Sequence, residues 1–166
     1  RDVERSRGLG DVYKRQAVDK MRKKQHKAAL DKIEEAKLWP RNLGVGKPYD
    51  EVIDTRLEDW LSFVAAERGG LKGQREHFLQ RLVGSNVNTP EYLLLQSAAW
   101  HIAGDETKAR KLADGWFAAQ KDETARRNGK EFLEVVGRGE YASDTALDFY
   151  KPLIQALTAK ADNRLF

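Results

Sequence analysis

The sequence predicts an all-α fold of antiparallel helical hairpins stacked as a solenoid. Apolar residues recur with helical spacing along most of the chain, and no segment shows the convincing apolar and polar alternation of a strand. Glycine and proline divide the chain into segments of helix length. Small and large residues also recur at fixed distances across neighbouring segments, as expected where two helices approach closely.

The first helix is expected over residues 18–38, with Met21, Ile33 and other apolar residues on one face. Trp39 and Pro40 should end it, because proline cannot continue a helix. The remaining helices are expected over residues 52–68, 72–83, 90–103, 106–120 and 123–136, and from Ser143 or Asp144 to residue 161.

Local sequence features set several of these boundaries. Thr89 is expected as the N-cap of the helix that Pro90 begins, since proline suits the first helical position. Gly104 should form the turn between two antiparallel helices. Gly129, which follows an asparagine, interrupts the helix over residues 123–136, so its first turns are expected to fray. Pro152 should bend the last helix or begin a new segment.

The spacing of small and large residues is clearest across the pair predicted over residues 90–120. The pattern consists of Ser97, Trp100, Gly104, Ala109, Ala113 and Trp116. It resembles the tetratricopeptide repeat, although Trp116 stands where that repeat usually has alanine. Ser62, Ala65, Gly69 and Phe78 follow the pattern more weakly, and Ala29, Ile33 and Ala36 resemble the second half of a repeat. The resemblance implies a tetratricopeptide-like solenoid.

A second resemblance is carried by residues 28–50, which contain Trp-Pro-Arg-Asn-Leu-Gly-Val-Gly-Lys-Pro, and by residues 148–157. These segments are similar to the helical-repeat tail of large, mainly bacterial proteins. Such proteins carry an upstream domain that we expect to be a β-sandwich similar to carbohydrate domains. The resemblance implies an architecture, and it assigns no catalytic residue to this chain.

Residues 6–16 resemble a translated sequencing-library adapter, because one reading frame of a transposon-end primer yields this peptide residue for residue. We therefore expect residues 1–16 to be an artefact and residues 17–166 to be the C-terminal fragment of a longer protein. The natural partner of the first helix would then be missing. Ala29, Ile33 and Ala36 are expected to lack part of their natural packing surface.

Composition narrows the classes of function. The chain is 34% charged and 40% hydrophobic, which suits a soluble helical protein and excludes a bundle of membrane-spanning helices. The formal net charge is +4, and residues 1–16 hold five cations and three anions, so the remainder carries +2. This near balance gives no reason to expect a nucleic-acid partner. The absence of cysteine rules out disulfides and thiolate chemistry.

Several groups of residues resemble parts of functional sites. Gly44, Gly46 and Lys47 resemble part of a phosphate-binding loop, but Arg41 and Pro48 replace its required glycine and hydroxyl residue, which favours a structural loop. The aromatic residues Trp39, Tyr49 and Trp60 would suit either sugar stacking or helix-end packing, and packing is favoured. The three histidines lack metal-ligand spacing. No cofactor, metal site or catalytic group is predicted.

The expected function is therefore a non-catalytic helical-repeat module for protein–protein interaction or intramolecular scaffolding within a larger bacterial protein. Its partner would be a protein, a peptide or the missing upstream domain. In a solenoid the first helix of each pair lines a groove. That register predicts a partner groove lined by Arg56, Asp59, Phe63, Glu91, Leu94, Ala98 and His101. The alternative is an accessory part of a carbohydrate-active enzyme whose catalytic domain lies upstream.

Overall fold

A computed structural model describes residues 2–38, 54–87 and 89–150. Within these ranges the regular structure is entirely helical, with seven α-helices, one 3-10 helix and helical residues 144–150. The elements are α1 Asp2–Arg22, α2 His26–Lys37, α3 Arg56–Gly69, α4 Lys72–Val83, η1 Pro90–Tyr92, α5 Leu93–Ala103, α6 Glu106–Ala119 and α7 Glu123–Gly137. The prediction of an all-α fold is confirmed.

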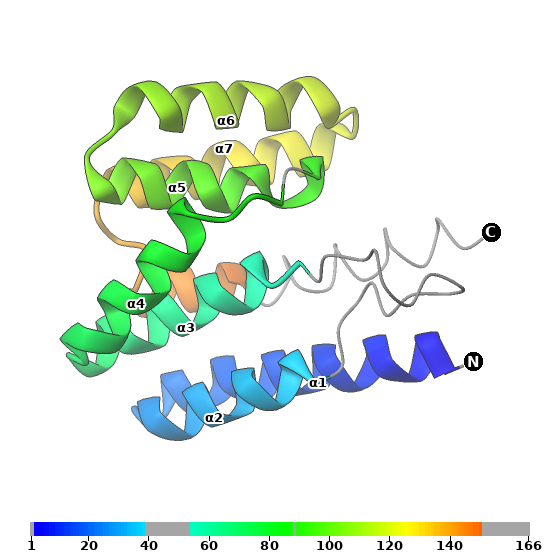
Figure 1. The fold of residues 1–166 in the computed structure, drawn as a ribbon, viewed down its shortest axis with the longest axis vertical. Helices are drawn as coiled ribbons and strands as arrows, with labels where there is room; N and C mark the ends of the chain where they lie inside the picture. Colours follow the sequence, from blue (N-terminus) through cyan, green and yellow to red (C-terminus); the bar gives the residue numbers. More distant parts are fainter. Residues whose placement is uncertain (1, 39–53, 88, 151–166) are drawn as a thin grey trace.

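The helices pack as sequential antiparallel pairs. The most extensive contacts lie within α1/α2, within α3/α4 and within α5/α6, and further contacts join α2 to α3 and α4 to α5. Figure 1 shows α1 and α2 at one end of the molecule, α5 and α6 at the other, and α3 with α4 between them. Because both neighbouring pairs pack against the middle pair, the core is centred on α3.

The first predicted helix is wrong in its boundaries. Residues 18–38 do not form one helix, since α1 ends at Arg22 and α2 begins at His26. The backbone of Lys24 lies in the left-handed region, with φ of 62°, and reverses the chain. Met21 and Ile33 are both buried, and α1 packs along α2. The turn thus lets two short apolar faces cover one another, which a single continuous helix would prevent.

The residues of α2 that were expected to lack part of their natural packing surface are covered by α1. Ala29 and Ile33 are fully buried, and Ala36 is 1% exposed. The adapter-like residues continue the same helix as Ala17 and Val18, and α1 as a whole covers α2.

The close approach predicted between α5 and α6 is present. Ser97 is buried on α5 and its hydroxyl donates a 2.6 Å hydrogen bond to the carbonyl of Ala109 on α6. Ala113 is buried one turn later. Gly104 ends α5 with φ of 97°, so the turn uses the left-handed conformation that glycine adopts without strain. Small residues therefore hold these two helices together at short range.

Gly129 has a different role from the predicted one. α7 is continuous from Glu123 to Gly137, so no interruption occurs at this position. A Cβ atom built on Gly129 would lie 2.4 Å from the ring of Trp116 and 3.2 Å from Leu94. The missing side chain therefore makes room for α7 against the α5/α6 pair.

The other predicted boundaries agree to within one residue where the structure describes them, except that the helix expected from residue 52 begins at Arg56. α4 begins and ends as expected. Thr89 precedes the helical turn that Pro90 begins, but its hydroxyl makes no cap and instead bonds to Arg56 and Asp54. The predicted stop at Trp39, the loop that follows it and the bend at Pro152 lie outside the described residues. Within the described ranges, none of the helices combines the length and the apolar content that spanning a bilayer requires.

The chain then returns from α7 to α3 and α1. Residues 141–150, called the returning segment below, include Tyr141, Leu147 and Tyr150, which are all buried in the central core. The guanidinium of Arg22 pairs with Asp148 across 126 positions of the sequence. A solenoid limited to contacts between neighbouring repeats contains no such closure.

Candidate functional site

The candidate site is the surface of α3 and α7 on which the returning segment lies, and α3 is at its centre. All eleven residues from Arg56 to Ala66 are buried, polar ones included. A helix that is covered on every side needs apolar residues around its whole circumference, and α3 supplies them with Leu57, Phe63 and Ala65 on different faces. Neighbouring helices cover most of α3, and the returning segment covers the rest.

Aromatic contacts hold the returning segment on α3 and α7. The rings of Phe63 and Tyr141 are stacked with centroids 5.6 Å apart, and Trp60 lies 6.1 Å from Tyr141. Tyr150 packs edge-on against Trp60 at 6.3 Å and near Phe132 of α7 at 6.4 Å. Aromatic pairs of this kind add about 0.5–1.5 kcal/mol each beyond their buried area. The five rings form one cluster. The three rings outside the returning segment, Trp60, Phe63 and Phe132, are called the aromatic face below.

Polar groups fix the position of the segment at the edge of this cluster. The hydroxyl of Tyr141 donates to Oε1 of Glu67 at 2.8 Å, while Arg75 donates to the other oxygen of Glu67 at 2.9 Å. The guanidinium of Arg68 donates to the carbonyl of Ala142 at 2.6 Å. A second nitrogen of Arg68 donates to Oδ1 of Asp144 at 2.8 Å. These bonds orient the first turn of the segment relative to the end of α3.

Burial keeps both tyrosines of the segment protonated. Burial raises the pKa of Tyr141, and its hydrogen bond to Glu67 raises that pKa further. Burial also raises the pKa of Tyr150 well above its usual range. The Tyr150 hydroxyl donates to the carbonyl of Tyr141 within the segment. Both hydroxyls donate hydrogen bonds within the chain, and the raised pKa keeps them protonated further into the alkaline range than an exposed tyrosine.

The predicted partner groove does not form an open surface on the described chain. Five of its seven residues are buried, namely Arg56, Asp59, Phe63, Leu94 and Ala98. Glu91 and His101 are partly exposed, and His101 pairs with Glu106. A solenoid register would place α3 and α5 on a groove, but the returning segment and neighbouring helices cover these positions.

Arg56 instead joins two helical pairs. Its guanidinium donates to both oxygens of Asp54, at 2.9 and 2.8 Å, and to Oε1 of Gln96 on α5 at 2.8 Å. It also reaches Oγ1 of Thr89 at 2.7 Å and lies 5.6 Å from the ring of Tyr92. With 1% of its surface exposed, it is a buried cation whose donors are satisfied within the chain.

Asp59 joins three helices in the same way. Its Oδ1 accepts from Lys37 of α2 at 3.0 Å and from Arg81 of α4 at 3.1 Å. Its Oδ2 accepts from the hydroxyl of Thr55 at 2.9 Å. The carboxylate is 4% exposed, so its two cations neutralise a charge that would otherwise be unfavourable to bury.

Glu58, the neighbour of Asp59, points elsewhere and meets α1. Its carboxylate lies 3.4 Å from Nζ of Lys14, which also contacts Asp11 at 3.3 Å. Burial raises the pKa of Glu58, although the nearby Lys14 opposes that shift. The two adjacent carboxylates therefore face different helices and share no cleft in which acid and base groups would act together.

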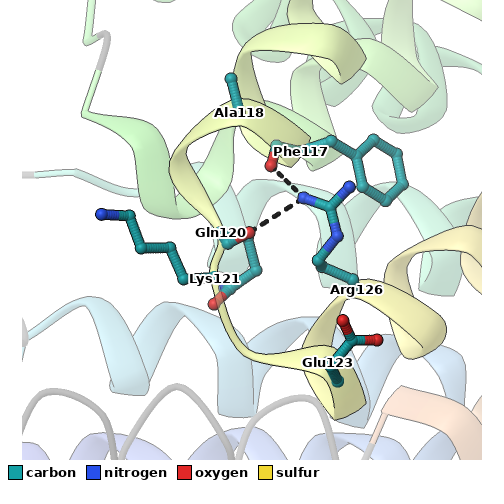
Figure 2. A pocket seen from close by; sticks show the side chains of 6 residues that line it. All are labelled: Phe117, Ala118, Gln120, Lys121, Glu123 and Arg126. Atoms are coloured by element: carbon teal, nitrogen blue, oxygen red, sulfur yellow. Dashed lines mark hydrogen bonds between the residues drawn. The ribbon is translucent and has the colours of Figure 1, made fainter.

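A shallow hollow of about 560 Å³ lies at the turn between α6 and α7 (Figure 2). It is lined by Phe117, Ala118, Gln120, Lys121, Glu123 and Arg126. Arg126 donates to the carbonyls of Phe117 and Gln120, so it satisfies the end of α6. Figure 2 shows Lys121 and Arg126 pointing apart, and the lining does not converge on one ligand.

Other predicted sites gain nothing from the structure. Trp60 is fully buried, so it packs the helices together as favoured and offers no sugar-stacking surface. Trp39, Tyr49 and the glycine-lysine loop lie outside the described residues. Among the residues that the structure describes, no group of three histidine or carboxylate side chains is placed to hold a metal ion.

Sequence reasoning missed the returning segment as part of the site. Tyr141, Leu147 and Tyr150 lie at spacings that put the last two on one face of a helix. That spacing predicted a helix here but not the surface on which it packs, because the matching aromatic residues of α3 are about eighty positions earlier.

Comparisons with known proteins do not identify the site: no family model matches the chain, and no curated protein or solved structure matches it.

Proposed function

We propose that this chain is a non-catalytic helical-repeat module, similar to tetratricopeptide arrays, that serves protein–protein interaction or intramolecular scaffolding within a larger bacterial protein. One observation carries the proposal. The aromatic face holds a helical segment through both ring contacts and directed hydrogen bonds. Docking a helix on an apolar face with polar anchors at the rim is a common mode of protein recognition.

The packing of the pairs supports the same proposal. The hydrogen bond from Ser97 to Ala109 and the burial of Ala113 follow the small-residue pattern that resembles the tetratricopeptide repeat. Two buried charged groups, Arg56 and Asp59, are engaged in contacts between helices. These features suit a scaffold whose polar residues fix the arrangement of its helices.

Selection of displayed helical peptides on the immobilised full chain tests this function. We expect enrichment of peptides that bind the chain in solution and that lose at least about tenfold in affinity with Arg68→Lys, since lysine cannot reproduce the directed guanidinium bonds. Arg110→Lys on the exposed face of α6 is the matched control and should leave binding unchanged. Failure to enrich any binder would contradict the interaction role, and glycoside turnover by the purified chain would contradict the non-catalytic assignment.

A further inference from the structure

The returning segment has two different faces. Its helical part, residues 144–150, turns one set of side chains to the core and the other to solvent. Ala146, Leu147 and Tyr150 are at most 1% exposed. Asp144, Thr145 and Asp148 are exposed. This is the pattern of an amphipathic helix bound in a groove, where anchors recur at helical spacing.

The connection to α7 allows this helix to leave as a unit. Residues 137–140 are all exposed, and Gly139 adopts φ of 74°. The connection makes local backbone hydrogen bonds back to α7, from Gly139 to Val136 and from Glu140 to Val135. Movement about an exposed glycine turn leaves the helical bonds of α7 intact. Exposed segments with few buried apolar contacts, such as residues 137–140, are the places where proteins open locally.

The ion pairs that hold the segment are weak ones. The side chain of Asp144, which pairs with Arg68, is 76% exposed, and that of Asp148, which pairs with Arg22, is 68% exposed. Water and salt screen such pairs, so they contribute little to stability. The segment is therefore held chiefly by its apolar residues and by the hydrogen bonds of Tyr141 and Arg68.

Arg68 retains an unused donor in this arrangement. Its two terminal nitrogens donate to the segment and to the carbonyl of Met21, but its Nε is buried and has no acceptor among the described residues. A carboxylate that contacted Nε and a terminal nitrogen together would form the stronger bidentate pair. The short side chain of Asp144 contacts only the terminal nitrogen.

We propose that the aromatic face takes a helical segment from a partner protein, and that the returning segment occupies this face in the free chain. The partner segment would carry an aromatic residue before its first turn, a glutamate in place of Asp144 to engage Arg68, and apolar residues in place of Leu147 and Tyr150. The inference rests on the proposed interaction function and specifies the chemistry of its ligand.

A peptide added in trans tests the displacement. The probe is a fluorescent peptide of residues 138–150, and its anisotropy is measured with the full chain. Leu147→Ala in the chain weakens the internal competitor and leaves the residues of the aromatic face unchanged, so we expect it to raise the affinity for the peptide at least about tenfold. Thr145→Ala, at an exposed position of the same segment, should leave the affinity unchanged. Equal affinities for the Leu147→Ala, Thr145→Ala and unchanged chains would overturn the proposal.

The role of Arg68 is tested by changing the peptide. A peptide with Asp144→Glu should bind the Leu147→Ala chain at least about threefold more tightly than the original peptide, and Arg68→Lys in the chain should remove that gain. A glutamate peptide that binds no more tightly than the original would overturn the assignment of Arg68 as the selecting group.

Hydrogen exchange on the unchanged chain tests whether the returning segment opens, without any substitution. Amides of residues 147–150 should exchange at least about tenfold faster than those of residues 61–65 in α3. Equal protection would show that the segment opens only with the whole core, and would overturn the proposal.

Dimerisation of the Leu147→Ala chain without peptide uptake would assign the face to a second copy instead. Displayed peptides that bind independently of Arg68 and of this face would leave an interaction function in place while contradicting this inference.

Discussion

α3 and α6 are helices of equal length with opposite surroundings. α3 is buried along eleven consecutive residues, whereas α6 buries only Ala109, Ala113 and Trp116. The other residues of α6 are exposed or half-buried. On α6 the charged residues are all exposed to water. On α3 each charged residue must find a partner within the protein, as Arg56 and Asp59 do. Equivalent substitutions should therefore have very different effects on the two helices.

The largest contrast is expected for tryptophan. Trp60→Ala should lower the free energy of unfolding by about 3–5 kcal/mol, because it empties the centre of the aromatic cluster. Trp100→Ala is the matched control on α5, where the ring is only partly buried and packs beside Lys108. Urea denaturation of both variants measures the difference. Equal losses would show that α3 is not the centre of the core.

A similar contrast should hold for arginine. Arg56→Ala should lower the free energy of unfolding by about 3 kcal/mol, since it leaves Asp54 and Gln96 without their buried donor. Arg110→Ala on the exposed face of α6 should change it by less than about 0.5 kcal/mol. Thermal and urea unfolding of both variants measures these changes. A mild effect of Arg56→Ala would mean that water replaces the guanidinium.

Replacing glycine by alanine should change the free energy of unfolding in opposite directions at two positions, because only one of them is closely packed. Gly129→Ala should lower the free energy of unfolding by about 1–3 kcal/mol, since the new methyl group would lie 2.4 Å from Trp116. Gly73→Ala in α4 meets no atom within 4 Å and should raise it by up to about 1 kcal/mol through better helix propensity. Stabilisation by both substitutions would contradict the close approach of α7 to α6.

The smallest effect concerns pH. Burial raises the pKa of Glu58 above its ordinary value of 4.5, so the folded chain binds this proton more tightly than the unfolded chain. The contribution of Glu58 to stability is therefore greatest below pH 4.5 and falls as the pH rises through the folded pKa. Glu58→Gln should remove this decline and gain roughly 1 kcal/mol or less at neutral pH.

Unfolding curves of the unchanged and Glu58→Gln chains at several pH values isolate this group from other carboxylates. Asp114→Asn on α6 is a suitable control, since it changes the same kind of charge outside the core. A constant difference between the unchanged and Glu58→Gln chains from pH 4 to 8 would show that Lys14 fully compensates the burial of Glu58.

Much of the helical pattern could be predicted from local residues. The bounds of α4 follow from flanking glycines, and the turn at Gly104 follows from the conformation that glycine allows. The turn at Lys24 could not be predicted this way, because no glycine or proline marks it. It exists because the apolar faces of α1 and α2 cover each other, which is a property of the packed pair.

Less of the candidate site could be predicted. Helical periodicity identified Phe63 and Leu94 as members of helices, but periodicity does not reveal how many neighbours surround a helix. Only the packed structure shows that α3 is enclosed and that Tyr141 stacks on Phe63. The predicted groove therefore coincides with positions that the chain itself covers.

The sequence alone determined that this protein is helical, where most of its helices begin and end, and that small residues lie between α5 and α6. These properties depend on hydrogen bonds and side chains within a few positions of each other. The tertiary structure decided which faces remain free, which charges are paired and where residues 141–150 bind. Those outcomes depend on contacts between residues far apart in the chain, whose free energies exist only once the helices have packed.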